Sequence, residues 1–407
     1  MGYLAAPGIQ TRYLNGSGFF NADFQSGAFS VLAYPTITGL VTGAAATPGS
    51  YQFVAGGSLS SSDATFSGEA GLADNNINAS YAGPIAGRFY GPTGQEVGAS
   101  FSGSGPNGGS FVGSFFGAKL GVPPGVNVSL ANLFVSQQFG IIDSDLMTGV
   151  PPTGAALQYS TDQLTLTPGG NITLAHGAGY SFLQDAIFTT ANIVAPSRPN
   201  FTTYQETVNG LPLEFDLYKP GASNTELALT YMDIGLWSQA ATPPQSPSNQ
   251  SSAFVFGILT PSAVLAGLSG SAHYAGVVYG NAVDDNLAAL YTVTGTSTFD
   301  VNFSSQTLSG SLNLTGAKVG GGAGESYGPF TFSGAAPLNS PLPPGNVGLA
   351  ATAIPISFNG TVQGLSQIQV QFFGPGAQEV GGSFFISYKG INQDLIAISG
   401  AAAAKRH

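Results

Sequence analysis

The strongest constraint on this sequence is a phrase that it uses twice. Residues 87–101 read GRFYGPTGQEVGASF, and residues 370–384 read VQFFGPGAQEVGGSF. A second pair of related segments, GSGFFNADF and GTSTFDVNF, precedes the two phrases in the same order, at 16–24 and 295–303. Repetition at this spacing indicates two related structural units within one chain.

The limits of the two units follow from the segments around the phrases. The segment ending at Lys119 parallels the one ending at Lys405, and Pro-rich stretches begin soon after residue 120. Strand-like segments run from residue 227 up to the second unit, whereas only 15 residues precede Gly16. If the second unit is a closed barrel, the first therefore carries only the later half of one. Such a half barrel has an open edge that another strand can pair with.

The pattern between the Gly, Asn, Ser and Pro clusters indicates β-structure. Short runs rich in aromatic and β-branched residues recur along the chain, for example AHYAGVVYG and STFDVNF. Runs of this length bounded by turn residues are typical of strands. Only 7% of the residues are charged, but 28 Phe and 16 Tyr supply material for a core. The sequence thus predicts an all-β protein rather than a disordered one.

Composition also excludes several classes of function. The net charge is −11, and the nine Lys and Arg residues are scattered, so no basic stripe exists to bind nucleic acid. The absence of Cys excludes disulfides and thiolate metal sites. The first residues contain no charged segment followed by an apolar one, so this sequence carries no export signal.

The repeated phrase itself predicts a turn rather than a catalytic site. An aromatic residue ends one strand, the pairs Gly91-Pro92 and Gly374-Pro375 turn the chain, and the next strand begins at Val. Small residues at Gly98 and Gly381 let a neighbouring group approach closely. We expect Glu96 and Glu379 to accept hydrogen bonds from turn amides or to pair with a base.

The phrase, together with GSAHYAGVVYG and the hairpin segments after it, resembles the transferrin-binding protein B family of Gram-negative surface lipoproteins. The resemblance is good over 13–120 and 227–406 and weak over 121–226. It implies two antiparallel barrels of about eight strands separated by a β-rich "handle". The expected domains are 1–120, the C-terminal part of a first barrel that is incomplete at its N-terminus, 121–226, the handle, and 227–407, a complete second barrel.

The resemblance implies a binding protein and not an enzyme. It implies a location at the outer-membrane surface or outside the cell, capture of an iron carrier, haem or another solute, and delivery to a TonB-dependent transporter. Because haem needs an axial ligand, His176 and His273 are the candidates, each with a Tyr nearby (Tyr180 and Tyr274). We otherwise expect no cofactor, no metal and no catalytic residue.

Two readings from other classes stay open. A structural or adhesive extracellular protein could assemble by strand addition at the open edge of the first barrel. An enzyme has little support, because GSGPNG at 103–108 fits a nucleotide-binding pattern but contains Pro and precedes no helix. A pair of carboxylates acting on a glycoside is a spatial feature that a sequence does not reveal.

Overall fold

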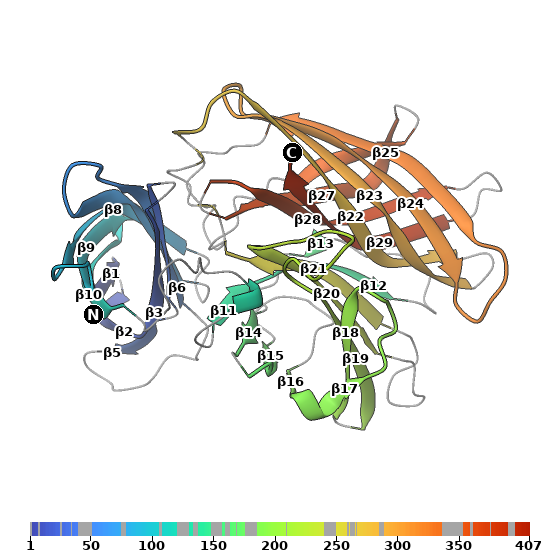
Figure 1. Ribbon diagram of the computed structural model, residues 1–407, viewed down its shortest axis with the longest axis horizontal. Helices are drawn as coiled ribbons and strands as arrows, with labels where there is room; N and C mark the ends of the chain where they lie inside the picture. The colour runs from blue at the N-terminus through green and yellow to red at the C-terminus, as the bar shows by residue number, and fades with distance from the viewer. Residues whose placement is uncertain are drawn as a thin grey trace. The chain divides into compact units, whose positions relative to one another are not determined.

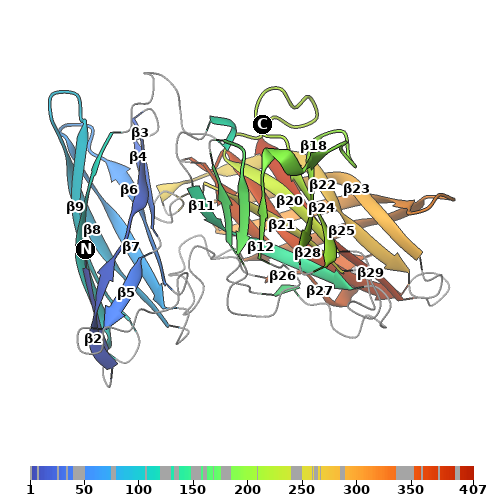
Figure 2. The ribbon, with the colours of Figure 1, turned by 90° about the horizontal axis from the view of Figure 1, so that it is seen from below.

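The chain divides into two compact units in the computed structural model shown in Figures 1 and 2. The first unit comprises Met1–Val128, Leu259–Leu268 and Pro337–Ala350, and the second comprises Ser129–Ile258, Ser269–Ala336 and Ala351–His407. The structure describes residues 2–6, 9–24, 27–33, 35–39, 51–74, 79–105, 108–119, 130–132, 137–147, 157–158, 163–167, 169–175, 185–208, 210–239, 250–258, 260, 265, 267–284, 289–335, 353–358, 361–374, 376–389 and 395–407.

The elements with defined bounds are strands and two short 3-10 turns, η2 (Leu130–Asn132) and η3 (Thr190–Asn192), and Leu265 and Gly267 have α-helical backbone. The predicted all-β class is therefore confirmed. Among these residues, no helix is both long and apolar enough to cross a membrane.

The first unit is one antiparallel sheet in the strand order β3-β4-β6-β7-β8-β9-β10-β1-β2-β5. Its strands are β1 (Gly2–Ala6), β2 (Ile9–Asn15), β3 (Gly18–Asp23), β4 (Ala28–Ala33), β5 (Thr36–Gly39), β6 (Tyr51–Leu59), β7 (Thr65–Asp74), β8 (Ala79–Tyr90), β9 (Glu96–Ser104) and β10 (Ser110–Ala118).

This sheet is curled, and its first and last strands are linked through the neighbouring hairpin segments. Asn15 of β2 pairs with Thr36 of β5, and Gly18 of β3 pairs with Ala33 of β4, so both pairs belong to one long hairpin. Strand β1 pairs with both β2 and β10, and the edge strands of the sheet are β3 and β5. The curled sheet encloses a single core to which β1, β2, β4 and β6 to β10 contribute side chains, among them Leu4, Phe29, Phe66, Ile85 and Phe111.

Strand β1 of the first unit has a shorter pairing than its counterpart in the second unit. This strand pairs with β10 only from Ser110 to Gly113, whereas its counterpart in the second unit pairs over eleven residues, from Tyr274 to Asp284. The described part of the first unit is thus a curled open sheet, in keeping with the incomplete barrel that the repeat predicts.

The second unit contains a closed barrel in the order β22 to β29. Its strands are β22 (Ser271–Asp284), β23 (Ala289–Asn302), β24 (Thr307–Lys318), β25 (Glu325–Ala335), β26 (Ala353–Phe358), β27 (Thr361–Phe373), β28 (Glu379–Lys389) and β29 (Leu395–Arg406). Aromatic rings meet across its interior, as Tyr274 does with Phe372 and Phe330 does with Tyr388. The interior is thus packed with side chains.

The remaining strands of the second unit form two smaller sheets, which we call the handle. The four-stranded sheet contains β11 (Gln137–Gly140), β14 (Gln163–Leu166), β15 (Ile172–Ala175) and β16 (Ala186–Phe188). The seven-stranded sheet contains β13 (Leu157–Gln158), β12 (Ile142–Met147), β21 (Gln250–Gly257), β20 (Met232–Gln239), β19 (Leu211–Tyr218), β18 (Phe201–Val208) and β17 (Ile193–Val194). Stacked rings of Phe188 and Phe215 join the two sheets.

The boundary expected at residue 227 is wrong, because β20 and β21 belong to the seven-stranded sheet and the barrel begins at Ser271. Both strands are buried along nearly their whole length, since one face packs in the handle and the other faces the barrel. Strands β12, β20 and β21 contact β28 and β29, as the ribbon shows (Figure 1). The strand-like segments that follow residue 227 and precede the barrel therefore belong to the seven-stranded sheet of the handle.

Candidate functional site

The repeated phrase forms the same turn in both units. Gly91 and Gly374 have φ angles of 83° and 84°, a left-handed conformation that glycine adopts without steric cost. The amide of Gly94 donates to the Gly91 carbonyl at 3.2 Å, and the amide of Ala377 donates to the Gly374 carbonyl at 3.3 Å. Pro92 is exposed in the first turn, and Pro375 lies outside the described residues.

The second copy holds the handle against the barrel through a buried carboxylate. Glu379, at the start of β28, accepts hydrogen bonds from the backbone amides of Thr230 at 2.7 Å, Tyr231 at 2.8 Å and Met232 at 3.0 Å. These amides belong to Met232, the first residue of strand β20, and to the two residues before it. They do not belong to the turn that precedes Glu379. Burial raises the pKa of Glu379, and the three amides and Lys405 oppose that rise.

The glycine two residues further along β28 makes room for the same strand. A Cβ at Gly381 would lie 2.1 Å from Cε of Met232 and 2.8 Å from the carbonyl oxygen of Ala402. The expected close approach at Gly381 thus has a specific neighbour, the first residue of β20. In the first unit, a Cβ at Gly98 would lie 3.3 Å from the ring of Tyr90.

Backbone pairing corrects one detail of the repeat. The amide of Lys119 donates to the Gln95 carbonyl, and the amide of Arg406 donates to the Gln378 carbonyl. Lys119 therefore corresponds to Arg406, one residue beyond Lys405. The residue pairing with Glu96 is consequently Ala118, not a lysine.

Lys405 adds a second bond between the barrel and the handle. It pairs across the strands with Glu379, and its Nζ donates to the carbonyl of Ala228 at 2.8 Å. One strand pair of the barrel thus contacts both the amides and a carbonyl of the chain entering β20. In the first unit Glu96 is exposed, and Ala118 carries no charge.

A second carboxylate gathers hydroxyl groups from both parts of the second unit. Glu226 accepts hydrogen bonds from Tyr218 of the handle at 3.1 Å, from Tyr279 of the barrel at 2.6 Å and from the Asn200 amide at 2.6 Å. Burial and the neighbouring Glu226 raise the pKa of Tyr279 to about 12 and that of Tyr218 further. Both hydroxyls therefore stay protonated and donate to the carboxylate.

Serine side chains continue the contact along the barrel. Oγ of Ser144 in β12 donates to the carbonyl of Phe384 at 2.7 Å, and Oγ of Ser399 donates to the carbonyl of Ser144 at 2.5 Å. Leu146 packs beside them against Phe385 and Ala397. Handle and barrel are thus joined by interlocking polar and apolar contacts within one unit.

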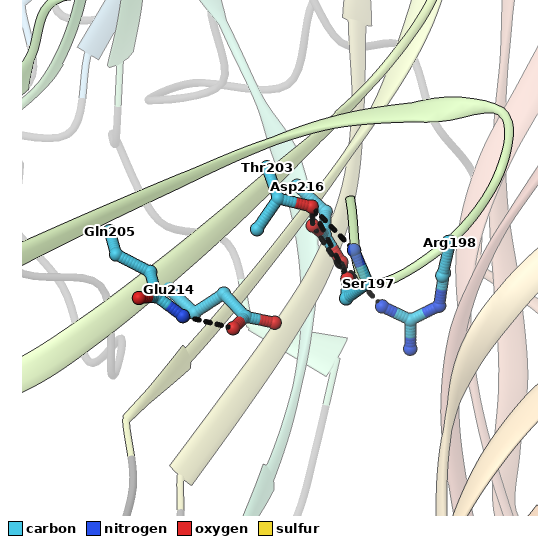
Figure 3. A network of polar contacts seen from close by, with 6 residues as sticks. All are labelled: Ser197, Arg198, Thr203, Gln205, Glu214 and Asp216. Atoms are coloured by element: carbon cyan, nitrogen blue, oxygen red, sulfur yellow. Dashed lines mark hydrogen bonds and ion pairs between the residues drawn. The ribbon is translucent and has the colours of Figure 1, made fainter. Parts of the chain in front are cut away.

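A separate polar network lies in the handle hairpin β18–β19 (Figure 3). The buried carboxylate of Asp216 accepts from Ser197 Oγ at 2.7 Å, from Arg198 Nη1 at 2.6 Å and from its cross-strand neighbour Thr203. The network fixes the segment that leads into β18. It is a closed set of partners within one hairpin, which favours a structural role.

Of the two candidate haem ligands, the structure describes His273 but not His176. His273 lies in β22 with 52% of its side chain exposed, and its Nδ1 is 2.7 Å from Asp300 Oδ1. Tyr274 points into the barrel and donates to the Ala377 carbonyl at 2.7 Å. Neighbouring strand residues face opposite sides of a sheet, so His273 and Tyr274 do not converge. His176 and Tyr180 lie outside the described residues.

The carboxylates of this arrangement bind main-chain amides and hydroxyls. Among the described residues, no three His, Asp or Glu side chains gather to hold a metal ion. Sequence reasoning missed Glu226, Asp216 and Ser144, because nothing in their local sequence marks them. Their partners lie on other strands.

Asp233 provides a pH test of this junction. Its side chain is fully buried, and burial raises its pKa well above the ordinary 3.8, with the charge of Glu379 adding to the rise. Between 3.8 and the raised pKa the folded state holds more protons than the unfolded state, so stability falls as pH rises.

We therefore expect Asp233 to contribute more to the free energy of unfolding at pH 5 than at pH 8. Urea titration at the two pH values measures the difference. Asp233→Asn should raise stability at pH 8 and flatten the difference, because the amide carries no charge to bury. A variant with an unchanged pH dependence would contradict the assignment.

Two features define the class of this protein: a closed eight-stranded barrel, and a handle sheet docked on its last two strands. Residues 267–406 match the family model described as the C-lobe and N-lobe β-barrels of transferrin-binding protein B. Residues 267–406 are therefore similar to the β-barrels of transferrin-binding protein B. No curated protein matches the sequence.

Solved structures of low identity also align with the chain. One is a double mutant of the vaccine antigen transferrin-binding protein B from Haemophilus parasuis Hp5, with 17% identity, 97% of this chain covered and a TM-score of 0.36. Another is isotype 1 transferrin-binding protein B from serogroup B Neisseria meningitidis, with 19% identity, 97% covered and a TM-score of 0.31. The chain spans 66% of the length of each.

Proposed function

We propose that this chain is a non-enzymatic binding protein of the bacterial cell surface or extracellular space that takes part in iron acquisition. The match of residues 267–406 to the barrels of transferrin-binding protein B carries the proposal. Stated in full, the proposal is that the protein captures an iron carrier, haem or another solute and passes it to a TonB-dependent outer-membrane transporter.

The packing of the barrels supports binding at the outside of the molecule. Rings and aliphatic side chains occupy both interiors, as the Phe53–Phe101 and Phe299–Phe332 contacts illustrate. A ligand is therefore expected on strand faces or on the loops that connect them, where binding residues are commonly carried by a rigid scaffold.

Capture is tested with immobilised protein and soluble carriers. We expect iron-loaded transferrin to bind and serum albumin not to bind, as measured by surface plasmon resonance. A haem titration read at the Soret band examines the second ligand class, and His273→Ala should leave that spectrum unchanged because His273 is exposed and bonded to Asp300. Absence of binding to every iron carrier and to haem would contradict the proposal.

The structural or adhesive alternative needs a strand edge that a second chain can extend. In the described part of the first unit, the edge strands of the sheet are β3 and β5. Concentration-dependent polymers in electron micrographs would favour that alternative, whereas ligand-dependent melting of a monomer favours capture.

A further inference from the structure

The end of strand β29, beside the C label in Figure 1, places a second histidine next to His273. Tyr274 pairs with Arg406 in the antiparallel register of β22 and β29, so the following pair joins His273 to His407. The amide of His407 donates to the His273 carbonyl at 3.1 Å, in agreement with this pairing. Directly opposite residues on antiparallel strands share a face, with Cβ atoms about 4.5–5.5 Å apart. The two imidazoles are therefore neighbours.

The face that the two histidines share is the outside of the barrel. Tyr274 is buried in the barrel, and neighbouring strand residues alternate between the two sides of a sheet, so His273 points outward. The side chain of His273 is 52% exposed, and His407 is exposed as well. An ion from solution can thus reach both rings without displacing any part of the core.

Asp300 orients the ring of His273. It lies opposite His273 on β23, and its Oδ1 is 2.7 Å from His273 Nδ1. When Nδ1 carries the proton and donates it to this carboxylate, Nε2 keeps a lone pair that can coordinate a metal ion. A carboxylate bonded to the far nitrogen of an imidazole is a common outer partner of a metal-bound histidine, and it raises the basicity of the ligand.

Two basic residues lie near the pair of histidines, and neither occupies the same place. Lys405 is on the outward face of β29, but its Nζ donates to the Ala228 carbonyl at 2.8 Å. Arg406 pairs with Tyr274 and therefore belongs to the other side of the sheet. The charge closest to His273 is the carboxylate of Asp300, which attracts a cation.

We propose that His273 and His407 together bind a divalent transition-metal ion, with Asp300 as the positioning residue for His273. Imidazole nitrogen is a ligand that Zn²⁺, Cu²⁺ and Ni²⁺ share. The chain supplies two ligands and water supplies the others, which is consistent with the lack of a three-ligand group among the described His, Asp and Glu residues. The site requires neither a carrier protein nor haem, so its test is separate from that of the proposed function.

The ligands also predict which ions bind. Affinity for nitrogen ligands is highest for Cu²⁺, with Ni²⁺ and Zn²⁺ below it. Ca²⁺ and Mg²⁺ prefer oxygen ligands and should not bind to two imidazoles. We therefore expect Cu²⁺ to bind more tightly than Zn²⁺, and a large excess of Mg²⁺ to displace neither ion.

The experiment is isothermal titration calorimetry of the whole chain with ZnCl₂ at neutral pH, in a buffer that does not chelate metals. We expect one Zn²⁺ ion per chain. Asp300→Asn should weaken binding about 10–100-fold, as the loss of an outer partner does. His273→Ala and His407→Ala should each weaken it by about 100-fold or more, because each removes a ligand outright.

The third histidine of the chain provides a matched control. The sequence contains three His residues, and His176 is far from the other two in the sequence. His176→Ala should therefore leave Zn²⁺ binding unchanged. Electron paramagnetic resonance of the Cu²⁺-loaded chain should show coupling to two imidazole nitrogens, and coupling to one in His407→Ala. Circular dichroism verifies that substitutions at these exposed positions leave the fold intact.

Three results would overturn the metal site. The first is no saturable binding of Zn²⁺ or Cu²⁺ up to millimolar concentration. The second is unchanged binding by His407→Ala, which would leave His273 without a second ligand. The third is a loss in His176→Ala as large as the loss in His273→Ala. Equal binding by Asp300→Asn and the normal chain would overturn the positioning role of Asp300.

Discussion

Replacing Glu379 by alanine is expected to lower the free energy of unfolding of the second unit by about 4 kcal/mol. The substitution leaves the amides of Thr230, Tyr231 and Met232 without their acceptor at a buried junction. Each buried donor left unsatisfied costs about 1–3 kcal/mol. Part of this loss is offset because the variant no longer buries the carboxylate whose pKa is raised by burial.

The repeat supplies a matched control for this prediction. Glu96→Ala removes the same residue from the same phrase at an exposed position, so we expect a change within about 0.5 kcal/mol. Urea unfolding followed by the fluorescence of Trp237, which lies buried in β20, reports on the junction directly. Equal effects of the two substitutions would show that the phrase acts through its turn and not through the carboxylate.

The same comparison shows how far the sequence predicts this structure. The turn, the following strand and the all-β class follow from the local pattern, because Gly-Pro and alternating apolar residues act on their own neighbourhood. Burial of Glu379 and exposure of Glu96 do not follow, because the two phrases are nearly identical. What differs is a strand from elsewhere in the chain.

The same limit explains the misplaced boundary at residue 227. Strands β20 and β21 have the length and apolar character of barrel strands, and they precede the barrel in the sequence. A strand's composition indicates that both faces are buried but not which sheet it joins. The pairing of β21 with β12, a strand far away in the sequence, places β21 in the seven-stranded sheet.

His273 shows what strand geometry adds to a candidate ligand found in the sequence. The sequence offers His273 as a haem ligand with Tyr274 nearby. The two-residue period of a strand already places them on opposite sides. The structure agrees, with Tyr274 inside the barrel and His273 outside beside Asp300.

Replacing Asp216 by alanine is the second large effect, and we expect a loss of about 3–5 kcal/mol in the free energy of unfolding. Asp216 is 2% exposed and accepts from Ser197, Arg198 and Thr203 (Figure 3). Removing one partner of a buried ion pair leaves the other charge uncompensated, which costs about this much. The guanidinium of Arg198, only 16% exposed, would lose its counter-ion.

The neighbouring pair on the same hairpin distinguishes a buried ion pair from a surface contact. Glu214 accepts from Gln205 at 3.0 Å in an exposed position, so Glu214→Ala should cost less than about 1 kcal/mol. The double variant Arg198→Met with Asp216→Ala removes both charges and should recover much of the loss from Asp216→Ala alone. If the double variant is instead as unstable as the sum of the single ones, the cost lies in the hydroxyl donors Ser197 and Thr203, and the ion pair contributes little.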